Sequence, residues 1–116
     1  MHELPVIEKI LRVVLSRAKD SGVKKVVAIH LTIGELSDLE EEWMQRYFDY
    51  CSRESLAEGA RLIIEKTPVR VRCRACGHEF PLDLDDAGNR FCPLCSSLKY
   101  TLVSGQGYYL ESIEAI

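Results

Sequence analysis

The sequence predicts an α+β fold with two helices, a small sheet, and a four-cysteine module inserted before the last strand. Apolar residues recur at helical spacing over residues 4–21 and 39–56. Strand-forming residues fill segments 23–33, 60–72 and 108–116, and the first of these alternates its two faces. Two CxxC pairs lie between the second and third strand segments, so the last strand follows the module in the chain.

The first predicted helix spans residues 4–21 and has one apolar face. Pro5 suits its first turn, and Gly22 suits the position just past its end. The apolar face consists of Ile7, Leu11, Val14, Leu15 and Ala18. Charged side chains occupy much of the remaining surface, so we expect one buried and one solvated face.

The second predicted helix spans residues 39–56 and begins with the acidic run 40–42. Ser37 and Asp38 offer a cap, and negative charge is favoured near a helix N-terminus. A broad apolar face follows, made of Trp43, Met44, Tyr47, Phe48 and Cys51. We interpret this face as core packing rather than a ligand site. We expect Cys51 to be a buried small hydrophobic residue, not a nucleophile.

The three strand segments differ in pattern. In segment 23–33 the two faces are Val27, Ile29, Leu31 and Ile33 against Ala28, His30 and Thr32. Pro68 has no N–H for a ladder, so segment 60–72 is expected to bend, break or lie at an edge there. Gly105 and Gly107 mark the exit from the cysteine module. Segment 108–116 is expected to return to the first sheet, because an isolated two-stranded ribbon is marginally stable.

The composition is that of a folded, acidic protein. The 116 residues are 47% hydrophobic and 28% charged, which argues against disorder, and the formal net charge is −3. Such a charge gives no global attraction to nucleic acid or anionic lipid, and no apolar run approaches the roughly 18 residues of a membrane span. The first residues lack the pattern of a signal peptide, so a cytoplasmic location is expected. Cysteines stay reduced there, which favours metal binding over disulfides.

The cysteine module carries the strongest motif. Cys73 and Cys76 form one CxxC pair, and Cys92 and Cys95 form another after about 15 residues. Two residues between ligands let one tight turn aim both sulfurs at one ion, and Gly77 frees the backbone after the first pair. Zinc takes four tetrahedral thiolates, which leave no open position for water or substrate. We therefore predict a structural Zn(II) site that supplies much of the folding free energy of this short, zinc-ribbon-like module.

Other interpretations of the module stay open. Two disulfides would use the same cysteines, and iron in a rubredoxin-like site would use the same thiolates. His78 competes as a ligand, although a solvent-facing loop histidine is the plainer interpretation. Arg70, Arg72 and Arg74 alternate along a strand. They suggest either a zinc-ribbon module that binds nucleic acid or protein, or one solvated strand face.

The amino terminus is a second metal-binding candidate. A bulky residue at position 2 blocks removal of the initiator methionine, so Met1 is expected to be retained. Its amine, the backbone nitrogen of His2 and the His2 imidazole can chelate one ion, and this donor set favours square-planar Ni(II) or Cu(II). Glu3 adds a carboxylate or a further backbone nitrogen. Taken alone, a histidine here also fits an accidental residue at a frayed terminus.

Both candidates occur together in one known family. Met1-His2-Glu3-Leu4 opening an amphipathic helix resembles the HypA/HybF family of hydrogenase-maturation nickel metallochaperones. The resemblance continues in order through segments 33–37 (IGELS) and 57–60 (AEGA), the two CxxC pairs and segment 111–114 (ESIE). It has two departures: Ser96 stands where the family commonly has glycine, and Tyr108-Tyr109 replaces a more polar approach to the last strand.

The resemblance implies metal-binding roles and two domains. His2, with the Met1 amine and Glu3, would bind Ni(II) as transported cargo, and the four cysteines would bind structural Zn(II). A three-stranded mixed or antiparallel sheet with two helices would form the nickel-binding domain, residues 1–69 with 108–116. Residues 70–107 would form the zinc-binding domain.

The resemblance also implies partners. Nickel would pass to the large subunit of a [NiFe] hydrogenase, with a nickel-handling, HypB-like maturation GTPase acting in the same process. No P-loop and no Ser-His-Asp order is present, so no enzymatic activity is expected. Neither a nucleic-acid nor a membrane partner is expected. A monomer, a homodimer and a domain-swapped form are all compatible with the sequence.

Overall fold

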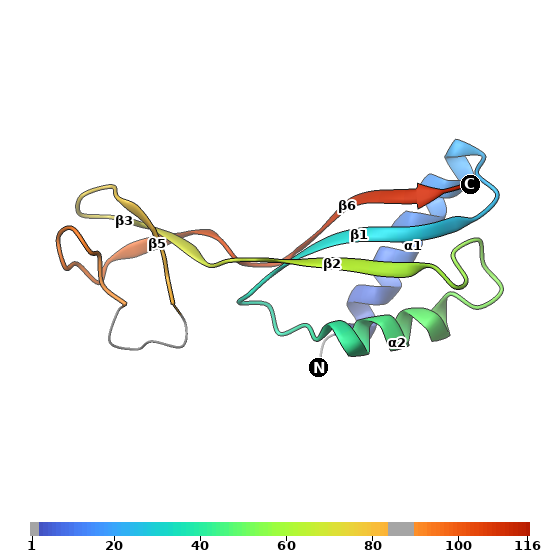
Figure 1. The fold of residues 1–116 in the computed structure, drawn as a ribbon, viewed down its shortest axis with the longest axis horizontal. Coiled ribbons are helices and arrows are strands. Elements are labelled where there is room, and N and C mark those ends of the chain that lie inside the picture. The colour runs from blue at the N-terminus through green and yellow to red at the C-terminus, as the bar shows by residue number, and fades with distance from the viewer. Residues whose placement is uncertain (1–2, 84–89) are drawn as a thin grey trace. The chain divides into compact units, whose positions relative to one another are not determined.

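The computed structural model describes residues 3–83 and 90–116. Its elements in chain order are α1 (Glu3–Ser21), β1 (Val26–Gly34), α2 (Glu41–Cys51), β2 (Arg61–Thr67), β3 (Arg70–Cys73), β4 (Glu79–Pro81), β5 (Tyr100–Ser104) and β6 (Tyr108–Ala115). These strands form two three-stranded sheets, ordered β2-β1-β6 and β4-β3-β5 (Figure 1). The predicted α+β class is confirmed, as is the return of the last strand to the first sheet. Among these elements, no helix is long and apolar enough to cross a bilayer.

The chain divides into two compact units, and it passes between them after Thr32, Ser37, Glu65 and Gly107. The helix-bearing unit holds α1, α2, β6 and most of β1 and β2. The cysteine-bearing unit holds β3, β4 and β5 together with Ile33–Ser37. The metal that each unit binds stays a prediction.

The helix-bearing unit buries apolar side chains between its helices and its sheet. Helix α1 crosses one face of the sheet (Figure 1), and it contacts both α2 and β6. The buried apolar side chains of α1, β1 and α2 in this unit are Ile7, Ile10, Leu11, Val14, Ala18, Val26, Ala28, Ile29, Leu31, Met44 and Phe48. The helical periodicity of the first helix therefore predicted most of its buried face; Ile10 was missing from the predicted set, and Leu15, which was in it, is only half-buried.

Two polar side chains of β1, His30 and Thr32, bond to the last strand, although Ala28 on the same face is buried. His30 Nε2 lies 2.9 Å from a carboxylate oxygen of Glu114, and the Thr32 hydroxyl donates to Glu111 at 3.1 Å. Both side chains on β1 are partly exposed, whereas the neighbouring Ile29 is fully buried. These cross-strand contacts explain why two glutamates occur in a strand that closes the sheet.

Helix α2 differs from its prediction at both ends. Its N-cap is Glu40, with no side-chain cap bond, so the predicted Ser37-Asp38 cap is wrong. The helix stops at Cys51 instead of residue 56. The Ser55 hydroxyl donates to the Ser52 carbonyl at 2.6 Å and accepts from the backbone N–H of Ala57 at 3.2 Å. Serine side chains that bond the local backbone in this way favour turns over helix, which explains the early end.

The apolar face of α2 is narrower than predicted. Met44 and Phe48 are fully buried, but Trp43 is 43% exposed and stacks on the ring of Tyr47 with centroids 5.8 Å apart. Cys51 is half-buried rather than buried. Burial raises the pKa of its thiol, which agrees with the prediction that it is not a nucleophile.

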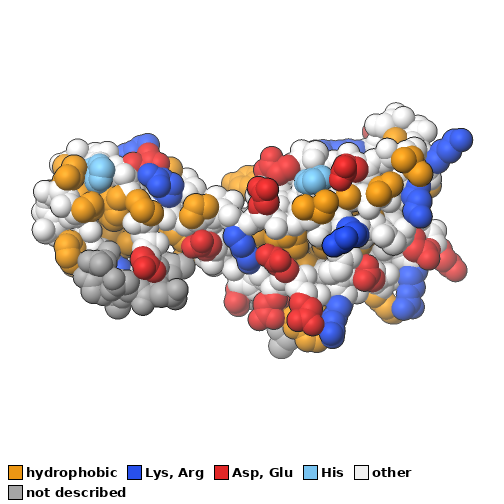
Figure 2. All heavy atoms as spheres, in the orientation of Figure 1, with side chains coloured by type: hydrophobic (Ala, Val, Ile, Leu, Met, Phe, Trp, Pro, Cys, Tyr) orange, Lys and Arg blue, Asp and Glu red, His pale blue; other side chains and the backbone are white. Residues whose placement is uncertain are grey.

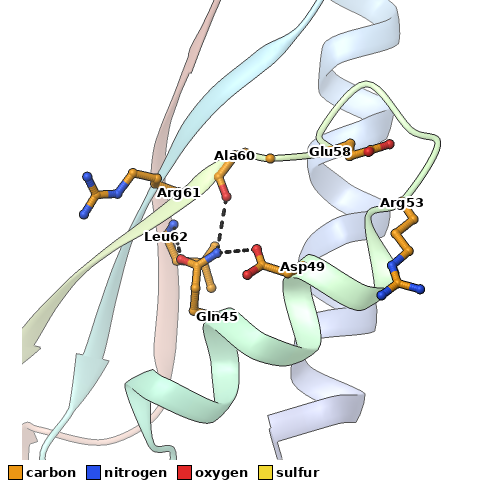
Figure 3. A pocket seen from close by; sticks show the side chains of 8 residues that line it. Gln45, Asp49, Arg53, Glu58, Ala60, Arg61 and Leu62 are labelled. Atoms are coloured by element: carbon orange, nitrogen blue, oxygen red, sulfur yellow. Dashed lines mark hydrogen bonds between the residues drawn. The ribbon is translucent and has the colours of Figure 1, made fainter.

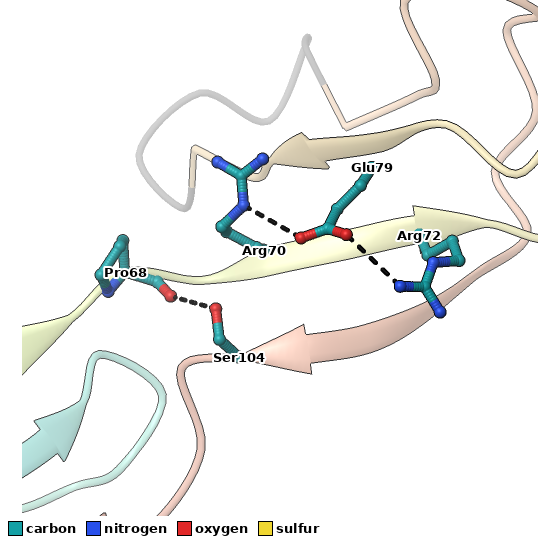
Figure 4. Close-up of polar contacts among 5 residues, drawn as sticks. All are labelled: Pro68, Arg70, Arg72, Glu79 and Ser104. Carbon is teal, nitrogen blue, oxygen red and sulfur yellow. Dashed lines mark hydrogen bonds and ion pairs between the residues drawn. The ribbon is translucent and has the colours of Figure 1, made fainter.

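The predicted strand 60–72 is broken at Pro68 into two strands that belong to different sheets. Strand β3 pairs in antiparallel fashion with β4 and β5, which the sequence did not predict, so that Val71 lies opposite both Phe80 and Leu102. The Ser104 hydroxyl donates to the carbonyl of Pro68 at 2.9 Å (Figure 4). Because proline has no N–H to donate, a chain crossing from one sheet to the next tolerates it here.

The cysteine-bearing unit has a small core. Its buried cluster is Val69, Val71, Cys73, Phe80 and Cys92, with Leu82 and Tyr100 packed against it. Tyr100 meets Phe80 edge to face, with centroids 6.1 Å apart. So few apolar side chains cannot hold a fold of this size alone, and two of the five buried residues are themselves candidate metal ligands.

Backbone hydrogen bonds hold segment Ile33–Ser37 against the residues at the two ends of segment 66–107 of the cysteine-bearing unit. The backbone N–H groups of Gly34, Glu35 and Leu36 donate to the carbonyls of Gly107, Thr67 and Gly105 at 2.8, 3.0 and 2.8 Å. A Cβ on Gly34 would overlap the backbone carbonyl of Gly105. Close backbone approach therefore explains the glycine of the IGELS segment.

Candidate metal centre

The four predicted ligands of the cysteine module converge. The sulfurs of Cys73, Cys76, Cys92 and Cys95 all lie within 4.8 Å of one another. Cys73 Sγ is 3.4 Å from Cys95 Sγ, and Cys76 Sγ is 3.6 Å from Cys92 Sγ. A disulfide needs about 2.05 Å, so neither contact is one. Tetrahedral zinc with bonds of about 2.3 Å separates its sulfurs by about 3.8 Å, which fits this cluster.

Each CxxC pair forms a turn closed by one backbone hydrogen bond. Gly77 N–H donates to the carbonyl of Cys73 at 3.0 Å, and Ser96 N–H donates to the carbonyl of Cys92 at 2.8 Å. The N–H of Ala75 also donates to Cys73 Sγ at 3.3 Å. These turns aim two sulfurs from each end of the module at one point, and N–H groups directed at sulfur stabilise thiolates.

The four thiols cannot all ionise together without a cation. The N–H of Cys76, helped by that of Ala75, lowers the pKa of Cys73 to about 6. The N–H of Ser97 lowers the pKa of Cys95, but the Cys73 sulfur and burial outweigh it and raise that pKa to about 12. A divalent cation removes the repulsion between the thiolates, so the donor set fits a metal ion such as zinc.

Of the residues predicted at the amino terminus, Met1 and His2 lie outside the described residues. Glu3 begins α1 and is only 4% exposed. Its Oε2 accepts a hydrogen bond from the backbone N–H of Glu40 at 3.1 Å. The first described residue of the chain is thereby tied to the start of α2.

An acidic pocket surrounds this contact. Its lining consists of Glu3, Asp38, Glu40, Trp43 and Tyr47. Figure 2 shows acidic side chains gathered over the start of α2. Carboxylates clustered in a hollow raise the local concentration of cations. The sequence pattern of α2 predicted its acidic start, but not that Glu40 of this run lines a pocket together with Glu3.

Comparison with known proteins decides the family. The model of one family, described as hydrogenase/urease nickel incorporation metallochaperone HypA, matches residues 1–115. The chain belongs to the HypA family. Because members of this family are metallochaperones, the predictions of family and of no enzymatic activity are confirmed.

Curated HypA relatives align over nearly their whole length. Hydrogenase maturation factor HypA of Dehalococcoides mccartyi strain 195 is 34% identical over 116 residues, covering 98% of this chain and 93% of the relative. That of Chlorobium luteolum is 35% identical over 113 residues, covering 97% and 94%.

Solved HypA structures share the fold. The solution structure of the Ni metallochaperone HypA from Helicobacter pylori superposes with a TM-score of 0.69 at 25% identity, covering 100% of this chain and 98% of that one. A second HypA solution structure gives 0.76 at 26% identity, covering 100% and 97%.

Two of the three arginines of the arginine face share one carboxylate in this HypA chain. Glu79 accepts from Arg70 at 3.3 Å and from Arg72 at 3.4 Å (Figure 4). Among the described residues, only Arg74 of the three arginines has no carboxylate partner. This glutamate offsets one of the three positive charges and holds two of the guanidinium groups, which is some evidence against the alternative of a nucleic-acid-binding zinc ribbon. His78 is not in the cysteine cluster but stacks on Phe80, with centroids 6.0 Å apart.

A further hollow in this HypA chain lies between α2 and the start of β2, where Gln45 uses its whole amide. Gln45 Oε1 accepts from Leu62 N–H at 2.9 Å, while Nε2 donates to Asp49 at 2.8 Å and to the Ala60 carbonyl at 3.3 Å (Figure 3). Arg53 and Glu58 also line this hollow. The amide is fully engaged in holding α2 to β2, which is a structural role.

Proposed function

We propose that this chain binds Ni(II) at its amino terminus and delivers it for maturation of a [NiFe] hydrogenase, with Zn(II) as a structural ion. One observation carries the proposal: the match to the nickel-incorporation family begins at residue 1, so it includes Met1-His2-Glu3. The proposed nickel ligands are the Met1 amine, the His2 imidazole and backbone nitrogen, and Glu3. The proposed zinc ligands are Cys73, Cys76, Cys92 and Cys95.

The donor chemistry supports this division of metals. An amine, a deprotonated backbone nitrogen and an imidazole favour square-planar nickel, whereas four thiolates suit tetrahedral zinc. A site at the chain terminus also allows release, which a carrier requires. The closed cysteine site leaves no position for exchange and serves the fold.

The partners follow from the same proposal. Nickel would pass to the hydrogenase large subunit, and a HypB-like maturation GTPase would act with this chain. We further propose that residues 1–69 with 108–116 form the nickel-binding domain and residues 70–107 the zinc-binding domain. The cytoplasmic location and the homodimer stay predictions.

Replacing one histidine tests the nickel site. His2→Ala is compared with His30→Ala, which removes a partly exposed imidazole from β1. We expect His2→Ala to abolish tight nickel binding in a calorimetric titration, with zinc content and fold unchanged. His30→Ala should bind nickel like the wild type. Equal loss of nickel in both variants, or joint loss of nickel and zinc in His2→Ala, contradicts the proposal.

Metal analysis tests the zinc site. Protein purified without added metal should contain zinc and be colourless. A red protein containing iron would instead indicate a ferric tetrathiolate centre.

A further inference from the structure

Strand β6 lies at an edge of its sheet and leaves one side of its backbone unpaired. The strand order is β2-β1-β6, so among the described residues no strand pairs with the outer edge of β6 (Figure 1). Exposed edges are usually protected by lysine, by proline or by a covering segment. The sequence of β6, YYLESIEA, contains neither lysine nor proline. Its two glutamates bond to His30 and Thr32, so both carboxylates are held toward β1.

The opposite edge of the same sheet, on β2, is partly closed. The amide of Gln45 accepts from the backbone N–H of Leu62 at 2.9 Å and donates to the carbonyl of Ala60 at 3.3 Å. A side-chain amide thereby occupies positions that an added strand would use. Strand β2 also contains Lys66, a residue type that protects edges. In the described part of the chain, no side chain bonds the backbone of β6 in this way, so β6 is the edge that is open to strand addition.

A hollow of about 240 Å³ lies between the last turns of α1 and the end of β6. Its lining is mainly apolar and consists of Arg17, Ala18, Ser21, Val23, Ile113 and Ala115. Ala18 is buried, whereas Arg17 is exposed, and no carboxylate among the described residues pairs with this arginine. The hollow therefore combines an apolar lining with one uncompensated positive charge, directly beside the open edge of β6.

We propose that the edge of β6 and this hollow form a docking site for an extended segment of a partner protein. The segment adds as a strand to β6, where main-chain hydrogen bonds supply affinity and side chains supply specificity. Alternate side chains of a strand share a face, so an apolar residue enters the hollow while an acidic residue two positions away meets Arg17. The partner is recognised by the pattern apolar-x-acidic in an extended conformation. None of the residues that line this site is a proposed metal ligand.

The test uses the full chain as purified and the fluorescein-labelled peptide Thr-Val-Thr-Val-Thr-Asp-Thr. When extended, this peptide has valine and aspartate side chains on one face. Fluorescence polarisation measures its affinity, and we expect saturable binding at one site with a Kd below about 1 mM. Amide exchange measured by NMR should slow along β6 and stay unchanged along β2 when the peptide is added.

Methylation of the peptide backbone tests strand addition. In a paired strand, alternate residues direct their N–H groups to the partner strand. Methylating the nitrogens of one alternate set should therefore abolish binding, whereas methylating the other set should change the affinity by less than about threefold. Equal effects of the two sets would show that the peptide does not pair with β6, which overturns the proposal.

A charge exchange tests the role of Arg17. Arg17→Glu should weaken binding of the aspartate peptide about fivefold, and it should strengthen binding of a peptide with lysine in place of aspartate. The matched control is Arg12→Glu, because Arg12 is another exposed arginine of α1 that does not line the hollow. This control should change either affinity by less than about twofold, since salt screens more distant charges.

Three further results would overturn the proposal. The first is a peptide that does not bind. The second is an aspartate peptide that binds Arg17→Glu as tightly as it binds Arg12→Glu. The third is slow amide exchange along the edge of β6 in peptide-free protein that sediments as a dimer, which would identify the occupant as a second copy of this chain.

Discussion

Ser96 adopts in the second cysteine turn the left-handed backbone conformation that Gly77 adopts in the first. Their φ angles are +62° and +77°, and each N–H closes its turn on the carbonyl of the first cysteine. A side chain in this region is strained, whereas glycine is not. The second turn therefore carries a strain that the first avoids.

Replacing Ser96 by glycine should stabilise the module. We expect Ser96→Gly to raise the free energy of unfolding of the zinc-loaded protein by about 0.5–1 kcal/mol, since relief of backbone strain exceeds the entropy cost of glycine. Urea denaturation measures the change. Gly77→Ala is the matched control and should lower the same free energy by about 1 kcal/mol. A loss of stability in Ser96→Gly would contradict the account of the two turns.

Gly34→Ala should destabilise the cysteine-bearing unit where segment Ile33–Ser37 packs on Gly105. The new Cβ would meet the Gly105 backbone, which cannot move like a flexible side chain, so we expect a loss of about 3 kcal/mol. Gly59→Ala is the control. Its φ of +79° brings strain, but no atom lies within 4 Å of the added Cβ, so about 1 kcal/mol is expected. Equal losses in the two variants, measured by urea denaturation, would show that close packing at Gly34 is unimportant.

Nickel affinity should fall on acidification. The proposed ligands must lose protons before they bind, and their ordinary pKa values are about 6.5 for imidazole and about 7.7–8.0 for a terminal amine. Protons therefore compete increasingly as the pH falls through and below neutrality. Calorimetric titrations at several pH values measure this. An affinity that stays flat from neutral to mildly acidic pH would count against these ligands.

Removal of zinc should unfold one unit and spare the other. The cysteine-bearing unit has a buried cluster of five residues, two of which are cysteines, whereas the core of the helix-bearing unit contains none of the four ligands. We expect a chelator, or Cys92→Ser, to abolish amide-exchange protection in β3 and β5 while protection in α1 and β1 persists. Protection of β3 that survives complete zinc removal would show that the metal is dispensable to the fold.

Local patterns predicted most of the elements of the helix-bearing unit. The spacing of Ile7, Leu11 and Val14 predicted the inner face of α1, and Gly22 predicted its end. In the structure, Gly22 adopts a left-handed φ of +66°, and the N–H of Val23 after it donates to the carbonyl of Ala18 at 3.3 Å. Such features depend on residues that are close in the chain, so they can be predicted from the sequence alone.

The features that the sequence did not predict depend on distant partners. Strands β4 and β5 are short and exist because β3 lies between them, and Glu79 forms ion pairs with Arg70 and Arg72 only after that pairing forms. The burial of Glu3 likewise depends on Glu40, which is 37 residues away in the chain. The spacing of the cysteines did predict their convergence, because two residues between the cysteines of a pair form a tight turn that directs both sulfurs to the same side.

The most direct test of nickel binding at the amino terminus is a nickel titration of zinc-loaded protein with and without one glycine placed before Met1. The added residue leaves the His2 side chain and the zinc site intact but moves the terminal amine away from its chelate ring. We predict that the native protein binds a single nickel ion and that the extended protein binds it far more weakly, with equal zinc in both. Native protein that ignores nickel at neutral pH, or extended protein that binds it equally tightly, would contradict the account.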